Sequence, residues 1–334
     1  MELTVLALSF TLLLILGVPV AFAIGLSSVA TIIAAGLPVA MVFQKMVGGM
    51  QVFSFLAIPF FVFAGELMLY GGIAERIIRF ANSLVGHVRG GLGMASILSA
   101  GAFGAVCGSS VATSATITQV AYPEMKRHGY AGRLSTATLA AGGTLGILIP
   151  PSVPLVVYAI LTEQNIAKLF AAALIPGILA MTGYLLVIFL YARARPDMAP
   201  LSPSLPMSEK WSALIAIWPI VGVFLIVFGG IYGGVYSPTE GAGVGAVLTM
   251  LLGFVKKELK LSGMQAALLS TAETTAMVFL IFLGADMMNA TLALTEMPKI
   301  IAEWVTHLPI PDLSIVILVL VLYVLLGCVM DELS

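Results

Sequence analysis

Long apolar segments, separated by short polar connections, run through this whole chain. The 334 residues are 60% hydrophobic and 9% charged, whereas soluble domains carry about 25% charged and about 45–50% apolar residues. A helix that crosses a bilayer needs about 20 mostly apolar residues. The runs are continuous and lack the alternation of β-barrel strands. The sequence therefore predicts an all-α polytopic membrane protein.

Charge and cysteine content narrow the function further. The formal net charge is -1, so nothing in the overall charge indicates a nucleic-acid partner. Cys107 and Cys328 both lie in apolar sequence, which favours two buried free thiols over a disulfide or a metal pair. The N-terminus, MELTVLALSF, has no basic region, so we expect a membrane segment there and not a cleaved signal peptide.

The first apolar segment, residues 3–35, is too long for one upright helix. It contains Gly17-Val18-Pro19, so it forms either one broken, tilted helix or two short helices. The remaining predicted membrane segments are 51–70, 91–124, 131–160, 166–191, 212–232, 238–255, 265–294 and 312–330.

Basic residues predict how these segments are oriented, because Lys and Arg gather in cytoplasmic loops. With the Lys- and Arg-rich connections on the cytoplasmic side, the segments from 51–70 to 265–294 cross in alternation except 91–124, which starts and ends inside. We therefore expect a re-entrant hairpin whose tip lies near Gly108-Ser109-Ser110. The Lys- and Arg-rich connections are 71–90, 125–133, 192–210 and 256–260.

The predicted tip is unusually polar for a membrane protein. Seven of the residues from Gly104 to Gln119 are Ser, Thr or Gln. Non-helical backbone at membrane depth is tolerated only inside protein or along a cavity. Hydroxyls together with free carbonyls suit a hard cation such as sodium. The alternative is that these small residues merely allow close helix packing.

A second irregularity lies in the segment 131–160, which contains GGTLGILIPPSVP. Pro150 and Pro151 remove two backbone donors and disfavour helical geometry before them. The helix should break between Gly146 and Ser152 and leave the carbonyls of Gly146 to Ile149 unpaired. A simple proline kink is the alternative, but a hairpin tip together with a broken helix is typical of transporters.

A weak internal repeat has opposite orientations in its two copies. Gly65-Glu66-Leu67-Met68 precedes an amphipathic stretch at 73–89, and Gly284-Ala285-Asp286-Met287 precedes another at 298–307. Both stretches are expected to lie in the membrane interface, on opposite sides. This inverted repeat makes 312–330 the first arm of a second hairpin. Since Glu66 and Asp286 lie near the ends of spans, we expect interfacial positions for both.

At these residues the chain resembles the large membrane subunit of TRAP transporters, the tripartite ATP-independent periplasmic carriers of organic acids. Members of this family continue past the position of Ser334, so the resemblance implies a C-terminally truncated member. The motifs that carry the resemblance are GVPVAFAIGL at 17–26, GSSVATSATI at 108–117, PEMKRHGY at 123–130, GGTLGILIPPS at 142–152, YSPTEGAGVGAV at 236–247 and GCVMDELS at 327–334.

The resemblance implies an elevator-type secondary transporter, built from inverted repeats, in the bacterial cytoplasmic (inner) membrane. It implies sodium-coupled import of a carboxylate such as a C4-dicarboxylate or a sugar acid, with sodium as coupling ion and no other cofactor. The implied partners are a small four-helix permease subunit and a periplasmic solute-binding protein. The implied sodium ligands are Ser109, Ser110, Thr113, Gly146, Ile149 and Pro151. The implied substrate-binding residues are Ser110, Thr113 and Asp331.

Three other readings stay open at this point. The chain could be a sodium-coupled carboxylate carrier of another family with the same two-hairpin plan. The chain could be a non-transporting fragment or scaffold subunit. It could also be an intramembrane serine hydrolase using Ser109 or Ser110, although the nearest histidine in sequence, His128, is predicted at the surface and no G-x-S-x-G pattern occurs. We therefore expect no enzyme. The expected organisation is an N-terminal membrane part at 1–50, a first repeat at 51–191, a cytoplasmic loop at 192–211, and connecting helices with an incomplete second repeat at 212–334.

Overall fold

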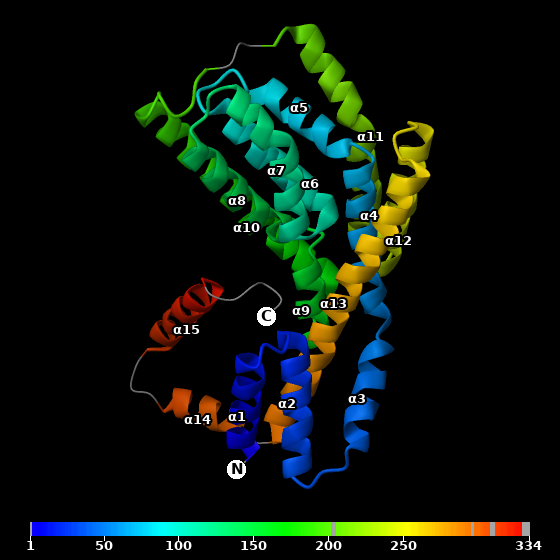
Figure 1. The fold of residues 1–334 in the computed structure, drawn as a ribbon, viewed down its shortest axis with the longest axis vertical. Helices are drawn as coiled ribbons and strands as arrows, with labels where there is room; N and C mark the ends of the chain where they lie inside the picture. The colour runs from blue at the N-terminus through cyan, green and yellow to red at the C-terminus, as the bar shows by residue number, and fades with distance from the viewer. Residues whose placement is uncertain (1, 202–204, 295–296, 308–310, 329–334) are drawn as a thin grey trace. The chain divides into compact units, whose positions relative to one another are not determined.

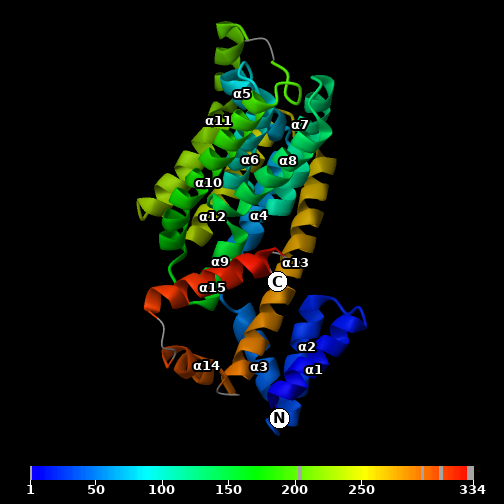
Figure 2. The same cartoon turned by 90° about the vertical axis from the view of Figure 1, so that its left-hand side faces the viewer.

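The computed structural model describes residues 2–201, 205–294, 297–307 and 311–328, and these residues form helices and no strand (Figures 1 and 2). Within these ranges, five helices are long and apolar enough to cross a membrane, and a bent pair makes a sixth candidate span. The prediction of an all-α polytopic membrane protein is confirmed. The candidate spans are Phe53–Tyr70, Ile166–Ala194, Met207–Tyr232, Pro238–Val255, Leu261–Ala293 and the pair Gly132–Leu148 with Val153–Leu161.

The helices follow the predicted segments closely. Their bounds are α1 Glu2–Ile15, α2 Val20–Ala34, α3 Ala40–Met50, η1 Phe53–Leu56, α4 Ala57–Tyr70, α5 Ile73–Val85, α6 Gly91–Cys107, α7 Ser110–Arg127, α8 Gly132–Leu148, α9 Val153–Leu161, α10 Ile166–Ala194, α11 Met207–Tyr232, α12 Pro238–Val255, α13 Leu261–Leu294, α14 Met297–Thr306 and α15 Asp312–Gly327.

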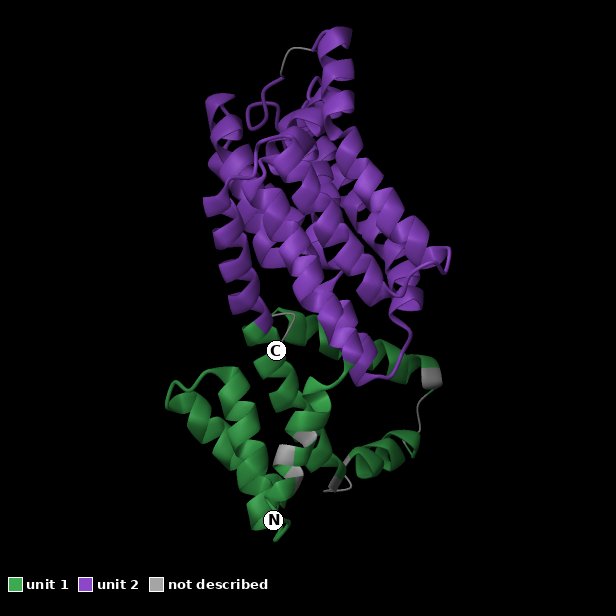
Figure 3. Cartoon of the chain, turned by 90° about the vertical axis from the view of Figure 1, so that its right-hand side faces the viewer, with its two compact units in different colours: residues 1–52, 276–334 green, residues 53–275 purple. Residues whose placement is uncertain are grey.

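The chain divides into two compact units (Figure 3). One unit contains residues 1–52 and 276–334, and the other contains residues 53–275. This division follows spatial contacts, whereas the division expected from the sequence follows the internal repeat. The predicted repeat organisation therefore stays a prediction.

In the first unit, the long N-terminal apolar segment forms two short helices, α1 and α2. Gly17 adopts a φ of +76° and Pro19 precedes the first residue of α2, which turns the chain back between the two helices. The buried hydroxyls of α2 are satisfied within the helix. Ser28 Oγ donates to the Ile24 carbonyl at 2.9 Å and Thr31 Oγ1 to the Ser27 carbonyl at 2.8 Å. Polar residues are therefore buried here without an unpaired group.

In the second unit, helix α6 packs against α4, α8 and α10. The side chains of Ile97, Phe103 and Leu145 are fully buried. The closest backbone approach joins α4 to the end of α6, because a Cβ added at Gly65 would lie 2.7 Å from the Cα of Cys107. Only glycine fits at that contact, so Gly65 fixes where the end of α6 sits.

The segment 91–124 folds as the antiparallel helix pair α6 and α7. Gly108, with a φ of +67°, and Ser109 make the tight connection between them, at the predicted tip. The start of α6 and the end of α7 therefore lie at the end of the pair that is opposite this connection (Figure 1). Its path through a membrane stays a prediction.

The segment 131–160 forms α8 and α9, which meet at an angle of 41°. Ile149 leaves the helix with φ -91° and ψ 121°, and Ser152 is extended. The interruption therefore covers Ile149 to Ser152, inside the predicted range.

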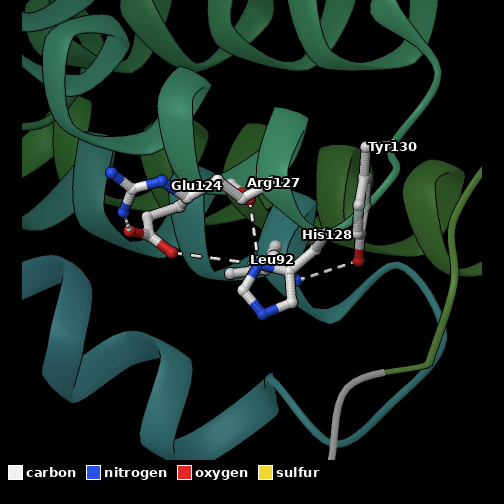
Figure 4. Close-up of polar contacts among 5 residues, drawn as sticks. All are labelled: Leu92, Glu124, Arg127, His128 and Tyr130. Carbon is white, nitrogen blue, oxygen red and sulfur yellow. Dashed lines mark hydrogen bonds and ion pairs between the residues drawn. The ribbon is translucent and has the colours of Figure 1, made fainter.

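The base of the hairpin is held by polar contacts between α6 and the connection to α8 (Figure 4). Gly90 precedes α6 with a φ of +78° and has no side chain to cap the helix. The N–H of Leu92, one of the unpaired first donors of α6, instead donates to the Tyr130 hydroxyl at 3.2 Å. Burial raises the pKa of the Tyr130 phenol, and the Leu92 N–H opposes that rise. At neutral pH the phenol therefore stays protonated.

We predict that Tyr130→Phe destabilises the hairpin base. The substitution leaves the buried N–H of Leu92 without an acceptor, which costs about 1–3 kcal/mol. The midpoint of thermal unfolding in detergent at pH 7 should fall, whereas Tyr158→Phe, at an exposed tyrosine, should leave it unchanged. Equal midpoints for both variants would show that the Tyr130 hydroxyl does not cap α6.

We also predict that His87 and His128 face the same side of the membrane. Both side chains are exposed, and they lie before α6 and after α7. Single His87→Cys and His128→Cys variants, in a Cys328→Ser background with the buried Cys107 retained, should react with an impermeant thiol reagent from one side. Labelling from opposite sides would make 91–124 a plain span.

Candidate functional site

The candidate site is the point where the hairpin tip meets the broken helix. The N–H of Val153 donates to the carbonyl of Gly108 at 3.1 Å. A Cβ added at Gly108 would lie 2.9 Å from the Pro151 carbonyl oxygen. The tip and the break are therefore in direct backbone contact, at a distance that only glycine permits.

Four helix ends converge at this contact. The helices α6 and α8 end here, and α7 and α9 begin here. Ser109 caps α7 by accepting from the N–H of Ala112 at 3.4 Å, and Ser152 caps α9 by accepting from the N–H of Leu155 at 3.4 Å. Helix C-termini carry partial negative charge and N-termini partial positive charge. The site therefore offers neighbouring positions suited to a cation and to an anion.

Thr113 supplies an unpaired hydroxyl at the centre of the site. Its side chain is 0% exposed, and among the described residues its Oγ1 has no hydrogen-bond partner. The Cys107 thiol is close enough to interact with it, but a thiol is a weak donor and acceptor. A Cβ added at Gly146 would lie 2.4 Å from Thr113 Oγ1 and 2.6 Å from the Ser109 carbonyl oxygen. Glycine at 146 thus lets the two helices bring these oxygens together.

Backbone carbonyls at the break lack their helical donors. Pro150 and Pro151 have no N–H, so the carbonyls of Gly146 and Ile147 cannot receive the bonds that would continue α8. The N–H of Val153 bonds to Gly108 and not to Ile149. Neutral oxygens of this kind, together with hydroxyls, are ligands for a hard cation.

The structure brings most of the implied sodium ligands together. Ser109, Thr113 and Gly146 face one another, and Pro151 lies against Gly108. Ser110 is the half-buried first residue of α7. The Ile149 side chain packs near Gly101 and Gly177, so this residue can contribute through its carbonyl. Asp331, the remaining implied substrate residue, lies outside the described residues.

Ser152 is a residue of this site that the sequence reasoning missed. It is completely buried and caps α9. A serine directly after Pro-Pro and before an apolar run is a helix-start signal, so the pattern could have identified it.

The structure shows the surroundings of Glu66 and of the two cysteines, and the interfacial position expected for Glu66 stays a prediction. Glu66 is 8% exposed, and its Oε1 accepts a hydrogen bond from Ser270 Oγ at 2.8 Å, so the carboxyl group is enclosed by protein and paired with α13. Cys107 is a buried free thiol as predicted. Cys328 is also a free thiol as predicted, but the prediction that it is buried is wrong, because it is exposed. It follows α15, whose large side chains are mostly exposed.

Residues 7–334 match the family model described as "Tripartite ATP-independent periplasmic transporter, DctM component". The chain belongs to this family. The predicted resemblance to TRAP large permease subunits is thereby confirmed across nearly the whole chain.

Curated relatives support the same assignment. The chain is 38% identical over 282 residues to the C4-dicarboxylate TRAP transporter large permease protein DctM of Pseudomonas aeruginosa, covering 84% of this chain and 65% of that protein. It is 34% identical over 330 residues to the isethionate TRAP transporter permease protein DctMQ of Oleidesulfovibrio alaskensis, covering 97% of this chain and 51% of that protein. It is 32% identical over 326 residues to the sialic acid TRAP transporter large permease protein SiaM of Vibrio cholerae, covering 96% of this chain and 75% of that protein. The chain thus spans about half to two-thirds of the length of the first two TRAP permeases.

We predict that Gly146→Ala disrupts this site of the TRAP permease chain. The added methyl group meets Thr113 and the Ser109 backbone, and overpacking of this kind costs about 1–3 kcal/mol. Gly183→Ala in α10 is the matched control, because a Cβ there meets no atom within 4 Å and alanine favours a helix. Thermal unfolding should start at a lower temperature in the first variant and not in the second. An unchanged midpoint for Gly146→Ala would contradict the close approach of α7 and α8.

Proposed function

We propose that this chain is the large membrane component of a sodium-coupled TRAP transporter that imports an organic acid. The observation that carries the proposal is the contact between the hairpin tip and the broken helix, where unpaired oxygens and four helix ends meet. Such discontinuous helices are the usual setting for ion and substrate sites in secondary transporters. Membership of the DctM family supports the same function.

Sodium is the coupling ion that this chemistry favours. The ligands we propose are neutral hydroxyl and carbonyl oxygens, whereas divalent cations such as calcium are usually held with carboxylates. The C-terminal ends of α6 and α8 add partial negative charge at the same place. The proposed ligands are Ser109, Ser110, Thr113, Gly146, Ile149 and Pro151.

The substrate we propose is a carboxylate that binds beside the sodium ion. The N-termini of α7 and α9 carry partial positive charge, which favours an anion. Ser110 and Thr113 would donate hydrogen bonds, and Asp331 is a further candidate. The curated relatives are named for C4-dicarboxylate, isethionate and sialic acid, so an organic acid is the substrate class.

The family supports partners and a location for this transporter. We place it in the bacterial cytoplasmic membrane with a small four-helix permease subunit and a periplasmic solute-binding protein. Alternating access would follow an elevator movement of the hairpin and broken helix, built on an inverted repeat.

A serine hydrolase is a poorer fit to the same residues. Ser110 and His128 stand at opposite ends of α7, which at 1.5 Å per residue puts them about 27 Å apart. A nucleophilic serine needs a base within hydrogen-bonding reach. His128 therefore cannot activate Ser110.

We predict that Thr113→Val weakens the response to sodium, whereas Thr116→Val does not. Both threonines are buried in α7 with an Oγ1 that has no partner in the described part of the chain, but only Thr113 is among the proposed ligands. Loss of one ligand should raise the half-maximal sodium concentration for uptake about tenfold, equivalent to ~1.4 kcal/mol.

The measurement is uptake in proteoliposomes that contain the complete permease, its small subunit and its binding protein, over a series of sodium concentrations. Without sodium, both variants should be as stable as the parent protein, since each loses an unsatisfied hydroxyl without losing volume. Identical sodium responses in the two variants would overturn the assignment of Thr113.

A further inference from the structure

A groove of about 490 Å³ lies between α6, α8 and α10, and its lining includes none of the proposed sodium ligands. Its volume is in the range of small-molecule sites. Along α8 the groove extends from Arg133 to Ala141, which at 1.5 Å per residue is about 12 Å. Its apolar lining includes Ile97 from α6, Leu134, Ala137 and Ala141 from α8, and Val187 and Ile188 from α10. An apolar channel of this length suits part of an acyl chain.

One end of the groove is polar and cationic. The helices α8 and α10 run antiparallel, because Gly93 lies against both Thr138 and Ile188, and Gly177 lies against Ile149. Arg133 and Tyr191, which both line the groove, are therefore at the same end. This end adjoins the connection 125–133, which the sequence predicts to be cytoplasmic. At the other end, the Tyr184 hydroxyl is hydrogen-bonded to Thr144 Oγ1 at 3.0 Å.

We propose that this groove binds an anionic phospholipid. One acyl chain lies between Ala137, Ala141 and Val187, and the phosphate is held by Arg133 and the Tyr191 hydroxyl. Basic pockets between membrane helices on the cytoplasmic side are suited to anionic head groups. Arg193, which lies 5.7 Å from the centre of the Phe189 ring, adds positive charge near this end of α10.

A lipid fits this groove better than a helix of a protein partner. A helix with its side chains is about 10–12 Å across, so it could cover the groove but not enter it. The small side chains of Ala137 and Ala141 line the groove and leave room for an acyl chain. Its positive end also matches a phosphate without the need for a second protein chain.

The test is lipid binding to the purified chain, measured by native mass spectrometry during titration with phosphatidylglycerol or phosphatidylcholine of the same acyl chains. The parent protein should retain one phosphatidylglycerol in preference to phosphatidylcholine. Arg133→Gln should weaken phosphatidylglycerol binding about fivefold, from the loss of one basic contact near the membrane surface. Arg127→Gln is the control, because Arg127 is exposed, pairs with Glu124 and lies outside the groove.

A second pair of variants tests the acyl-chain position independently of charge. Ala141→Leu should fill the groove and abolish retention of phosphatidylglycerol, whereas Ala140→Leu, at an exposed neighbour outside the groove, should not. Equal helix content and thermal midpoints in the two leucine variants show that folding is intact. Equal binding of both lipids by the parent, or full retention in Ala141→Leu, would overturn the proposal. The proposal would also be overturned if a bound protein subunit covers the groove and excludes phosphatidylglycerol.

Discussion

The requirement that backbone polar groups be paired away from water determines most of this structure. Helices satisfy it internally, and buried hydroxyls in α2 donate hydrogen bonds to carbonyls of the same helix. At the ends of helices, groups from other segments form hydrogen bonds with the backbone N–H groups. The N–H of Val153 bonds to Gly108 across two segments, and Tyr130 accepts from the first turn of α6. The candidate site exists because this pairing is incomplete there.

Glycines let the helices approach closely enough for the unpaired groups to gather at the candidate site. At Gly65, Gly108 and Gly146 an added Cβ would lie within 3 Å of a neighbouring backbone or hydroxyl atom. These three contacts bring together α4, the hairpin tip and the end of α8. The same closeness buries the Thr113 hydroxyl without a hydrogen-bond partner among the described residues. A cation of suitable size would supply the missing interaction.

The candidate site and the groove offer a ligand different groups. At the hairpin tip, neutral oxygens and helix ends are packed closely and suit a small ion with a carboxylate beside it. In the groove between α8 and α10, one arginine accompanies apolar side chains, which suits a lipid. The difference follows from α8, which is intact along the groove and interrupted at the hairpin tip.

The sequence by itself determined the helical class, the candidate spans, the position of the hairpin tip near Gly108 and the break after Gly146. These features depend on local chemistry, namely apolar length, basic loops and prolines without N–H groups. Only the tertiary structure decided that the first apolar segment is two helices, that Glu66 is enclosed and paired with Ser270, and that Ser152 belongs to the site. It alone revealed the groove, because Arg133 and Tyr191 are distant in sequence. Contacts of this kind depend on how helices pack against one another, and local residue patterns carry little information about that packing.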